Sequence, residues 1–218
     1  MKEPRDDTRF GVMRHAPTLW NRERRIQGQL DSPLTPEGER MAREWGERLR
    51  CFGWQRILTS DLERTRQTAE LINRILRVPL AVDARLREKD WGEWTGKTIV
   101  QIRLQSGEQL AAMESAGWGF RPPGGEDRTE VWRRGHHALM EASRTWQGER
   151  ILVVTHEGMI KCLVYRLTGR SFFPTEPPLL RRGHLHRLAH GQRGMSIEEL
   201  NALALWEEIG RASCRERV

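Results

Sequence analysis

Two arginines and two histidines of this 218-residue chain stand just after short apolar runs of the kind that form buried parallel strands. They are Arg14, His15, Arg64 and His156. A neutral imidazole, whose unperturbed pKa is about 6.5, is available as a nucleophile near neutral pH. A guanidinium stays charged and binds two phosphate oxygens at once. These residue types therefore predict phosphoryl transfer, with His15 as the nucleophile and Arg14 beside it binding the phosphate.

The order of the predicted elements brings these residues together. Strand and helix patterns alternate along the chain, which is typical of an α/β protein with a doubly wound, mostly parallel sheet. Ligands bind beyond the carboxyl ends of the strands in such sheets, so we expect the four residues to meet at one rim. Residues 95–125 are harder to assign to a helix or strand. The glycines and prolines of residues 117–125 indicate a loop or the edge of a lid over this rim. We expect strands at residues 10–13, 56–59, 150–155, 184–189 and 199–205, and helices at residues 36–52, 62–76, 126–146 and 157–167.

Charge and composition restrict the class of partner. The formal net charge is +7, but the basic residues are scattered, and only four of the 37 are lysine. A small phosphorylated metabolite accounts for positive charge, whereas nucleic-acid binding would predict clustered basic residues. The three cysteines support neither a disulfide framework nor a zinc site. With no apolar leader and no segment of membrane-spanning length, we expect a cytoplasmic protein that binds neither membrane nor nucleic acid.

The last eleven residues require a separate interpretation. Residues 208–218, EIGRASCRERV, have no periodicity and match the translation of a common sequencing adapter in one reading frame. We therefore expect them to be absent from the native protein and leave them out of the fold prediction. The prediction assigns residues 1–207 to a single domain.

Several segments match the motifs of one enzyme family in order and spacing. They begin with RHAPTLWN at residues 14–21 and end with VVTH at residues 153–156. Together they resemble the histidine phosphatase (phosphoglycerate mutase-like) superfamily over most of residues 9–205. The segments between these two are QGQLDSPLT at 27–35, TSDLERTRQTA at 59–69, LRE at 86–88, WGEWTG at 91–96 and GGE at 124–126.

This resemblance implies a three-layer α/β/α sandwich with a mostly parallel sheet, and a reaction that needs neither metal nor another cofactor. It implies that His15 carries the phosphoryl group, while Glu88 protonates the leaving alcohol and later activates water. The other expected site residues are Arg14, Arg64 and His156 in the phosphate pocket, Asn21 as a phosphate contact, and Gln27 and Gly28 at the mouth.

Two positions differ from the family pattern. Ala16 stands where the family usually has glycine, and it would be strained if the backbone there had a positive φ. Glu157 also replaces a common glycine, and its carboxylate would repel a phosphate nearby. We expect Glu157 instead to cap the helix that begins there, where the helix dipole favours a negative charge.

The resemblance favours hydrolysis of a phosphomonoester. Phosphoglycerate mutases carry extra sequence after the acid, whereas this chain has only residues 95–125 there, and residues 28–31 resemble the phosphatase branch. Cofactor-dependent phosphoglycerate mutase remains the alternative, and a non-catalytic module that binds a phospho-ligand is the alternative of another class. The sequence does not select among substrates such as α-ribazole phosphate, and it leaves a homodimer open.

Overall fold

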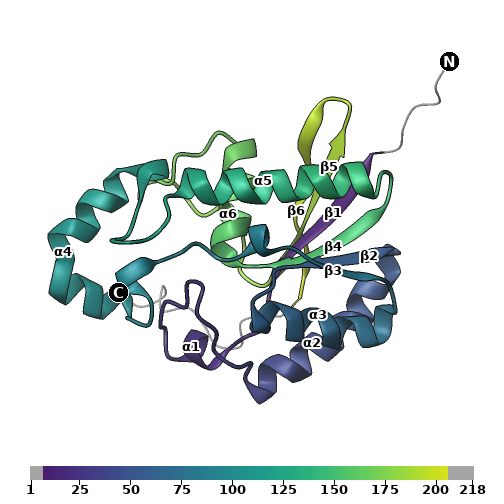
Figure 1. Ribbon diagram of the computed structural model, residues 1–218, viewed down its shortest axis with the longest axis horizontal. Helices are drawn as coiled ribbons and strands as arrows, with labels where there is room; N and C mark the ends of the chain where they lie inside the picture. The colour runs from purple at the N-terminus through teal and green to yellow at the C-terminus, as the bar shows by residue number, and fades with distance from the viewer. Residues whose placement is uncertain (1–6, 206–218) are drawn as a thin grey trace, which may run out of the picture.

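The computed structural model describes residues 7–205, and its centre is a six-stranded sheet (Figure 1). Four strands are parallel in the order β3-β2-β4-β1, and β5 and β6 add an antiparallel hairpin at the edge next to β1. The adapter-like residues 208–218 lie outside the described residues. The strands are β1 (Thr8–Arg14), β2 (Arg56–Thr59), β3 (Leu80–Val82), β4 (Arg150–Thr155), β5 (His184–Gly191) and β6 (Gly194–Ala204).

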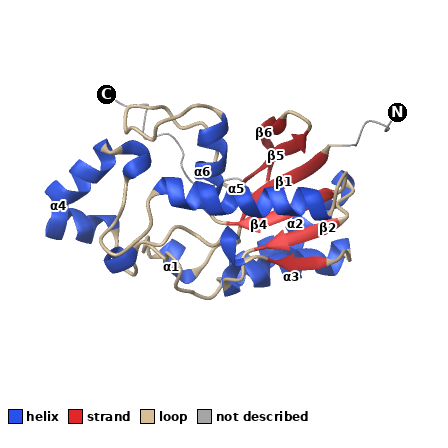
Figure 2. Ribbon diagram, turned by 45° about the horizontal axis from the view of Figure 1, so that its top comes forward, coloured by secondary structure: helices blue, strands red, loops and turns tan. Residues whose placement is uncertain are grey.

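Helices cover both faces of this sheet, which makes the predicted three-layer α/β/α sandwich. Figure 2 shows α2 and α3 on one face and α5 and α6 on the other. The longer helices are α2 (Pro36–Leu49), α3 (Glu63–Leu76), α4 (Ile99–Ser115), α5 (Arg128–Thr145) and α6 (Glu157–Leu167). The shorter helical segments are α1 (Leu19–Arg22), η1 (Arg50–Phe52), η2 (Ala84–Leu86), η3 (Gly92–Trp94) and η4 (Gly117–Gly119).

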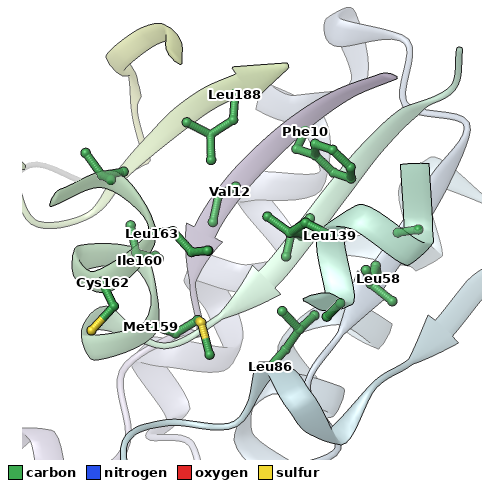
Figure 3. Close-up of a cluster of buried hydrophobic side chains, with 14 of the residues drawn as sticks. Phe10, Val12, Leu58, Leu86, Leu139, Met159, Ile160, Cys162, Leu163 and Leu188 are labelled. Carbon is green, nitrogen blue, oxygen red and sulfur yellow. The ribbon is translucent and has the colours of Figure 1, made fainter. Parts of the chain in front are cut away.

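The central strands are apolar on both faces because each face packs against a helical layer. Val12 of β1 and Val153 of β4 belong to the cluster under α5 and α6, which Figure 3 shows. Their neighbours Met13 and Val154 belong to the opposite cluster, under α2 and α3. Two helical layers therefore fix β1 and β4 from both sides, and with them the residues that follow each strand.

The predicted strands and helices are all present, with bounds that differ by a few residues. Thr35 caps α2 through a hydrogen bond from Gly38 N to its Oγ1 (2.9 Å). The sequence prediction did not include β3 or α4, and α4 fills much of the segment that was hard to place. It lies beyond the carboxyl ends of the strands (Figure 1), where Ile102 and Leu110 form a small separate core with Trp94 and Phe120.

Candidate active site

The expected site residues gather at one end of the sheet. Arg14 ends β1, with His15 next in the chain, and His156 lies between β4 and α6. Arg64 is the second residue of α3, and Glu88 follows η2. A cleft of about 740 Å³ opens at this rim. Of the expected residues, the cleft is lined by Arg14, His15, Asn21, Gln27, Gly28, Arg64 and Glu88, whereas His156 lies buried behind His15.

The geometry of His15 suits a nucleophile. The residue is 3% exposed, and its Nδ1 lies 2.7 Å from the carbonyl oxygen of Ala16. Because that oxygen can only accept, Nδ1 carries the proton and the lone pair of Nε2 is left free. Burial, with Arg14 and Arg64 close by, holds the pKa of His15 well below its ordinary value. The imidazole is therefore neutral at physiological pH.

Ala16 fits its position without strain. It is fully buried, its amide donates to Thr68 Oγ1 (3.0 Å), and it is not among the described non-glycine residues with a positive φ. The expected consequence of replacing the family glycine therefore does not arise. The backbone that presents His15 keeps an ordinary conformation.

His156 packs against His15, with ring centroids 5.3 Å apart. It is fully buried, and its Nε2 lies 3.1 Å from Ser60 Oγ. No atom of the described residues is hydrogen-bonded to its Nδ1. Burial first, and then Arg64 and His15, hold the pKa of His156 well below its ordinary value. If Ser60 donates to Nε2, Nδ1 carries a proton that a phosphate oxygen can accept.

Arg64 is almost completely buried and holds the loop at the mouth of the cleft. Its Nη1 donates to Leu30 O (2.7 Å) and Asp31 Oδ1 (2.9 Å), and its Nη2 donates to Gly28 O (2.7 Å). A guanidinium has five N–H donors, so Nε and one hydrogen of Nη2 are left over. Nε has no partner within residues 7–205. These two donors have the fork geometry that binds a phosphate.

Glu157 corrects the sequence prediction. It begins α6, as expected, but its carboxylate does not cap the helix. It lines the cleft instead, where Oε2 accepts from Arg14 Nη1 (2.8 Å) and Oε1 lies 3.0 Å from Lys161 Nζ. Burial opposes its charge, but Arg14 and Lys161 outweigh burial and hold the pKa of Glu157 at about 2. The Glu157 carboxylate is therefore already hydrogen-bonded to Arg14, one of the arginines that are expected to bind phosphate.

Glu88 lines the cleft, and two backbone amides hold its carboxylate. Its Oε1 accepts from Lys89 N (2.8 Å), and its Oε2 accepts from Gly158 N at the start of α6 (3.2 Å). A Cβ at position 158 would lie 2.3 Å from Glu88 Oε1. Glycine at 158 therefore allows the carboxylate to approach α6 this closely, a requirement that sequence reasoning missed.

Arg134 of α5 fixes the loop that carries Glu88, and it too was missed. Its guanidinium donates to the carbonyl oxygens of Arg85 (2.7 Å), Arg87 (2.6 Å) and Glu88 (2.9 Å). It also pairs with Glu126 at 2.8 Å. Glu126 belongs to the GGE motif, which was the signal that an anchor lies nearby. Glu88 is therefore held from α5 as well as from α6.

Asn21 and Gln27 are joined through Thr18. Asn21 lines the cleft, and its Oδ1 accepts from Thr18 N (3.2 Å), which leaves the Nδ2 donors available. Gln27 Nε2 donates to Thr18 Oγ1 (2.8 Å), and Gln27 Oε1 has no hydrogen-bond partner among the described residues. Both amides therefore keep hydrogen-bonding capacity for a ligand.

Comparison with known proteins assigns the chain to a family. The family model of the histidine phosphatase superfamily (branch 1) matches residues 10–203. The chain belongs to this superfamily. A relative from Salmonella paratyphi B, named "Probable phosphoglycerate mutase GpmB", is 40% identical over 177 residues, covering 81% of this chain and 82% of the relative.

Several solved structures have the same architecture. Bacillus stearothermophilus YhfR superposes with a TM-score of 0.83 at 29% identity, covering 92% of this chain and all of that one (100%). The mycobacterial glucosyl-3-phosphoglycerate phosphatase superposes with a TM-score of 0.77 at 28% identity, covering 90% of this chain and 100% of that one. The α-ribazole phosphatase from Shigella flexneri superposes with a TM-score of 0.74, covering 92% of this chain and 100% of that one. At 23% identity, this similarity shows the shared fold alone.

The cleft is also lined by residues outside the set expected from the sequence. Among them is Trp91, which the sequence placed near the rim as a possible substrate contact. Lys89, Arg128 and Phe172 also line the cleft, and sequence reasoning singled out none of these three as a site residue. Residues 7–205 contain no group of three or more side chains arranged to hold a metal ion. No helix in the same range is long and apolar enough to cross a membrane.

Proposed function

We propose that this chain hydrolyses a small phosphomonoester through a phosphohistidine on His15, without a metal ion. The observation that carries the proposal is the hydrogen bond from His15 Nδ1 to Ala16 O, because it keeps a proton on Nδ1 and so makes Nε2 the nitrogen that is free to attack in the neutral ring. The lowered pKa of His15 supports the same role. A non-catalytic binding module would have no need of such a nucleophile.

The first step transfers the phosphoryl group to His15. Nε2 attacks phosphorus, the P–O bond to the alcohol breaks, and its electron pair stays on the leaving oxygen. Glu88, in its protonated form, gives that oxygen a proton. The free donors of Arg64, together with Arg14, neutralise the charge on the phosphoryl oxygens. We assign His156 to the same pocket, with Ser60 donating to its Nε2 so that Nδ1 has a proton to give to the phosphate.

The second step returns the enzyme to its starting state. Glu88, now a carboxylate, takes a proton from a water molecule, which attacks phosphorus. The P–N bond breaks, Nε2 regains its lone pair, and inorganic phosphate leaves. Similarity to the mycobacterial glucosyl-3-phosphoglycerate phosphatase supports water as the acceptor.

Phosphoglycerate mutase is the second candidate, because the Salmonella relative carries that name. The two functions differ only in whether water or a second alcohol receives the phosphoryl group. A panel of phosphomonoesters that includes phosphoglycerate, assayed with and without a chelator, separates them. We expect release of inorganic phosphate that the chelator does not change. Movement of phosphate between positions of phosphoglycerate faster than its release would favour the mutase, and loss of turnover with chelator would overturn the metal-free mechanism.

A further inference from the structure

Lys89 is a buried lysine on the wall of the cleft. The residue is 4% exposed, and Nζ donates to Phe120 O (2.7 Å). Nζ also lies 4.1 Å from the ring centroid of Phe120 and 5.2 Å from that of Trp91. An ammonium group has three N–H donors, so two of them are left for a ligand.

A second cation stands beside the same aromatic ring. Arg128, the first residue of α5, donates through Nη1 to Gly117 O (2.7 Å). Its guanidinium carbon lies 4.5 Å from the ring centroid of Phe120 and 4.3 Å from that of Phe172. Both Lys89 and Arg128 line the cleft that contains His15.

Neither cation has a counter-ion in the part of the chain that the structure describes. No carboxylate oxygen of residues 7–205 lies within 4.0 Å of the nitrogens of Lys89 or Arg128, whose hydrogen bonds go to backbone carbonyls. Removing two positive charges from water without a nearby anion is unfavourable. A negatively charged group bound in the cleft that both residues line would reduce this cost.

We propose that Lys89 and Arg128 bind a second anionic group of the substrate, carried on the leaving alcohol. The inference rests on the proposed function, in which Arg14, Arg64 and His15 hold the phosphate that is cleaved. It narrows the substrate class to phosphomonoesters whose alcohol also bears a carboxylate or a second phosphate. Lys89 and Arg128 then determine specificity rather than take part in the bond-breaking step.

The titration of Lys89 agrees with a site that lacks its anion. Burial first, and then Arg128, lower the pKa of Lys89 to about 7, while Cys162, Glu88 and Asp127 act in the opposite direction. The ammonium therefore loses its proton as the pH rises through about 7 in the free protein. Binding of an anion would favour the charged form and raise this pKa.

The test compares synthetic esters that differ only at the far end of the alcohol. One alkyl phosphate carries a terminal carboxylate, one carries the neutral primary amide, and a third carries a terminal phosphate. The readout is the ratio of kcat/KM for each charged ester to that for the amide. For the wild type we expect a ratio of about tenfold or more, the size typical of charge-assisted hydrogen bonds. Whichever of the two charged esters has the larger ratio identifies the anion.

Substitutions then test which residues cause the preference for the charged esters. Lys89→Met keeps the length of the side chain but not its charge, and we expect the ratio to fall to about one to three. Lys89→Arg should keep the ratio, and Lys97→Met, a lysine that does not line the cleft, should keep it as well. Arg128→Met is the second variant, should Lys89→Met fail to fold. In the wild type the ratio should also fall as the pH rises through about 7, whereas in Lys89→Arg it should persist.

Binding of non-hydrolysable phosphonates with the same tails separates this inference from the proposed function. If no ester is hydrolysed, the proposed function fails, but calorimetry still tests the subsite. Tighter binding of the carboxylate phosphonate than of its amide by the wild type, lost in Lys89→Met, would support it. A wild-type ratio of charged to neutral ligand near one would overturn the proposed subsite. A ratio that neither Lys89→Met nor Arg128→Met reduces would overturn it as well.

Discussion

Glu157 should compete with the substrate for Arg14. The two side chains form a hydrogen-bonded ion pair at 2.8 Å inside the cleft, and a bound phosphate must share Arg14 with this carboxylate. A hydrogen bond to a charged group contributes about 1.5–3 kcal/mol. The side chains are 15% and 34% exposed, and solvent screening lowers the net value to about 1 kcal/mol. A change of this size corresponds to about fivefold in affinity.

The variant Glu157→Gln removes the negative charge but keeps an oxygen that can accept from Arg14. We expect the inhibition constant of inorganic phosphate and the KM of the ester each to fall about fivefold. Steady-state kinetics with added phosphate measure both. Glu70→Gln is the matched control, because Glu70 lies on the exposed side of α3, 4.0 Å from Arg66. If both constants stay within twofold of the wild type or rise, Glu157 positions Arg14 instead of competing for it.

Three further substitutions and conditions test the site. In Gly158→Ala the new Cβ would lie 2.3 Å from Glu88 Oε1, so kcat should fall by about tenfold or more, while Gly107→Ala, with open space around it, should keep wild-type kcat. Arg134→Met removes three hydrogen bonds to the loop before and at Glu88, so chemical denaturation should show a loss of about 2–4 kcal/mol. The lowered pKa of Glu157 stabilises the fold above about pH 4.5, and this contribution is lost as the pH falls towards 2. The difference in unfolding free energy between the wild type and Glu157→Gln should therefore shrink over that range.

The sequence predicted the central strands because their signal is local. Residues 150–155 form a nearly continuous apolar run, and such a run is typical of a strand covered on both faces. β3 was missed because three residues, Leu80–Val82, are too few to show a pattern. In α4 the pattern is misleading, since Val100 and Leu104 are exposed while Ile102 and Leu110 are buried, and the helix is kinked at Ser106.

The site residues likewise divide into those that a local sequence pattern predicted and those that it did not. His15 and His156 were predicted because each directly follows a strand, whereas Glu88 was identified only through its resemblance to a family motif. Lys89 was missed since it lies in a charged segment that reads as solvated surface. Its burial comes from Phe120, which is 31 positions further along the chain. Contacts between distant segments of this kind leave no local trace in the sequence.

The most direct test of the central claim is the identity of the residue that carries the phosphoryl group. Mixing the full chain with an ester, quenching within milliseconds in base and mapping the peptides by mass spectrometry would locate it. We predict one phosphoryl group per chain, on His15, in an acid-labile and base-stable linkage, and no turnover by His15→Ala. Undiminished hydrolysis by His15→Ala, or rapid turnover with the phosphoryl group on another residue, would contradict the mechanism.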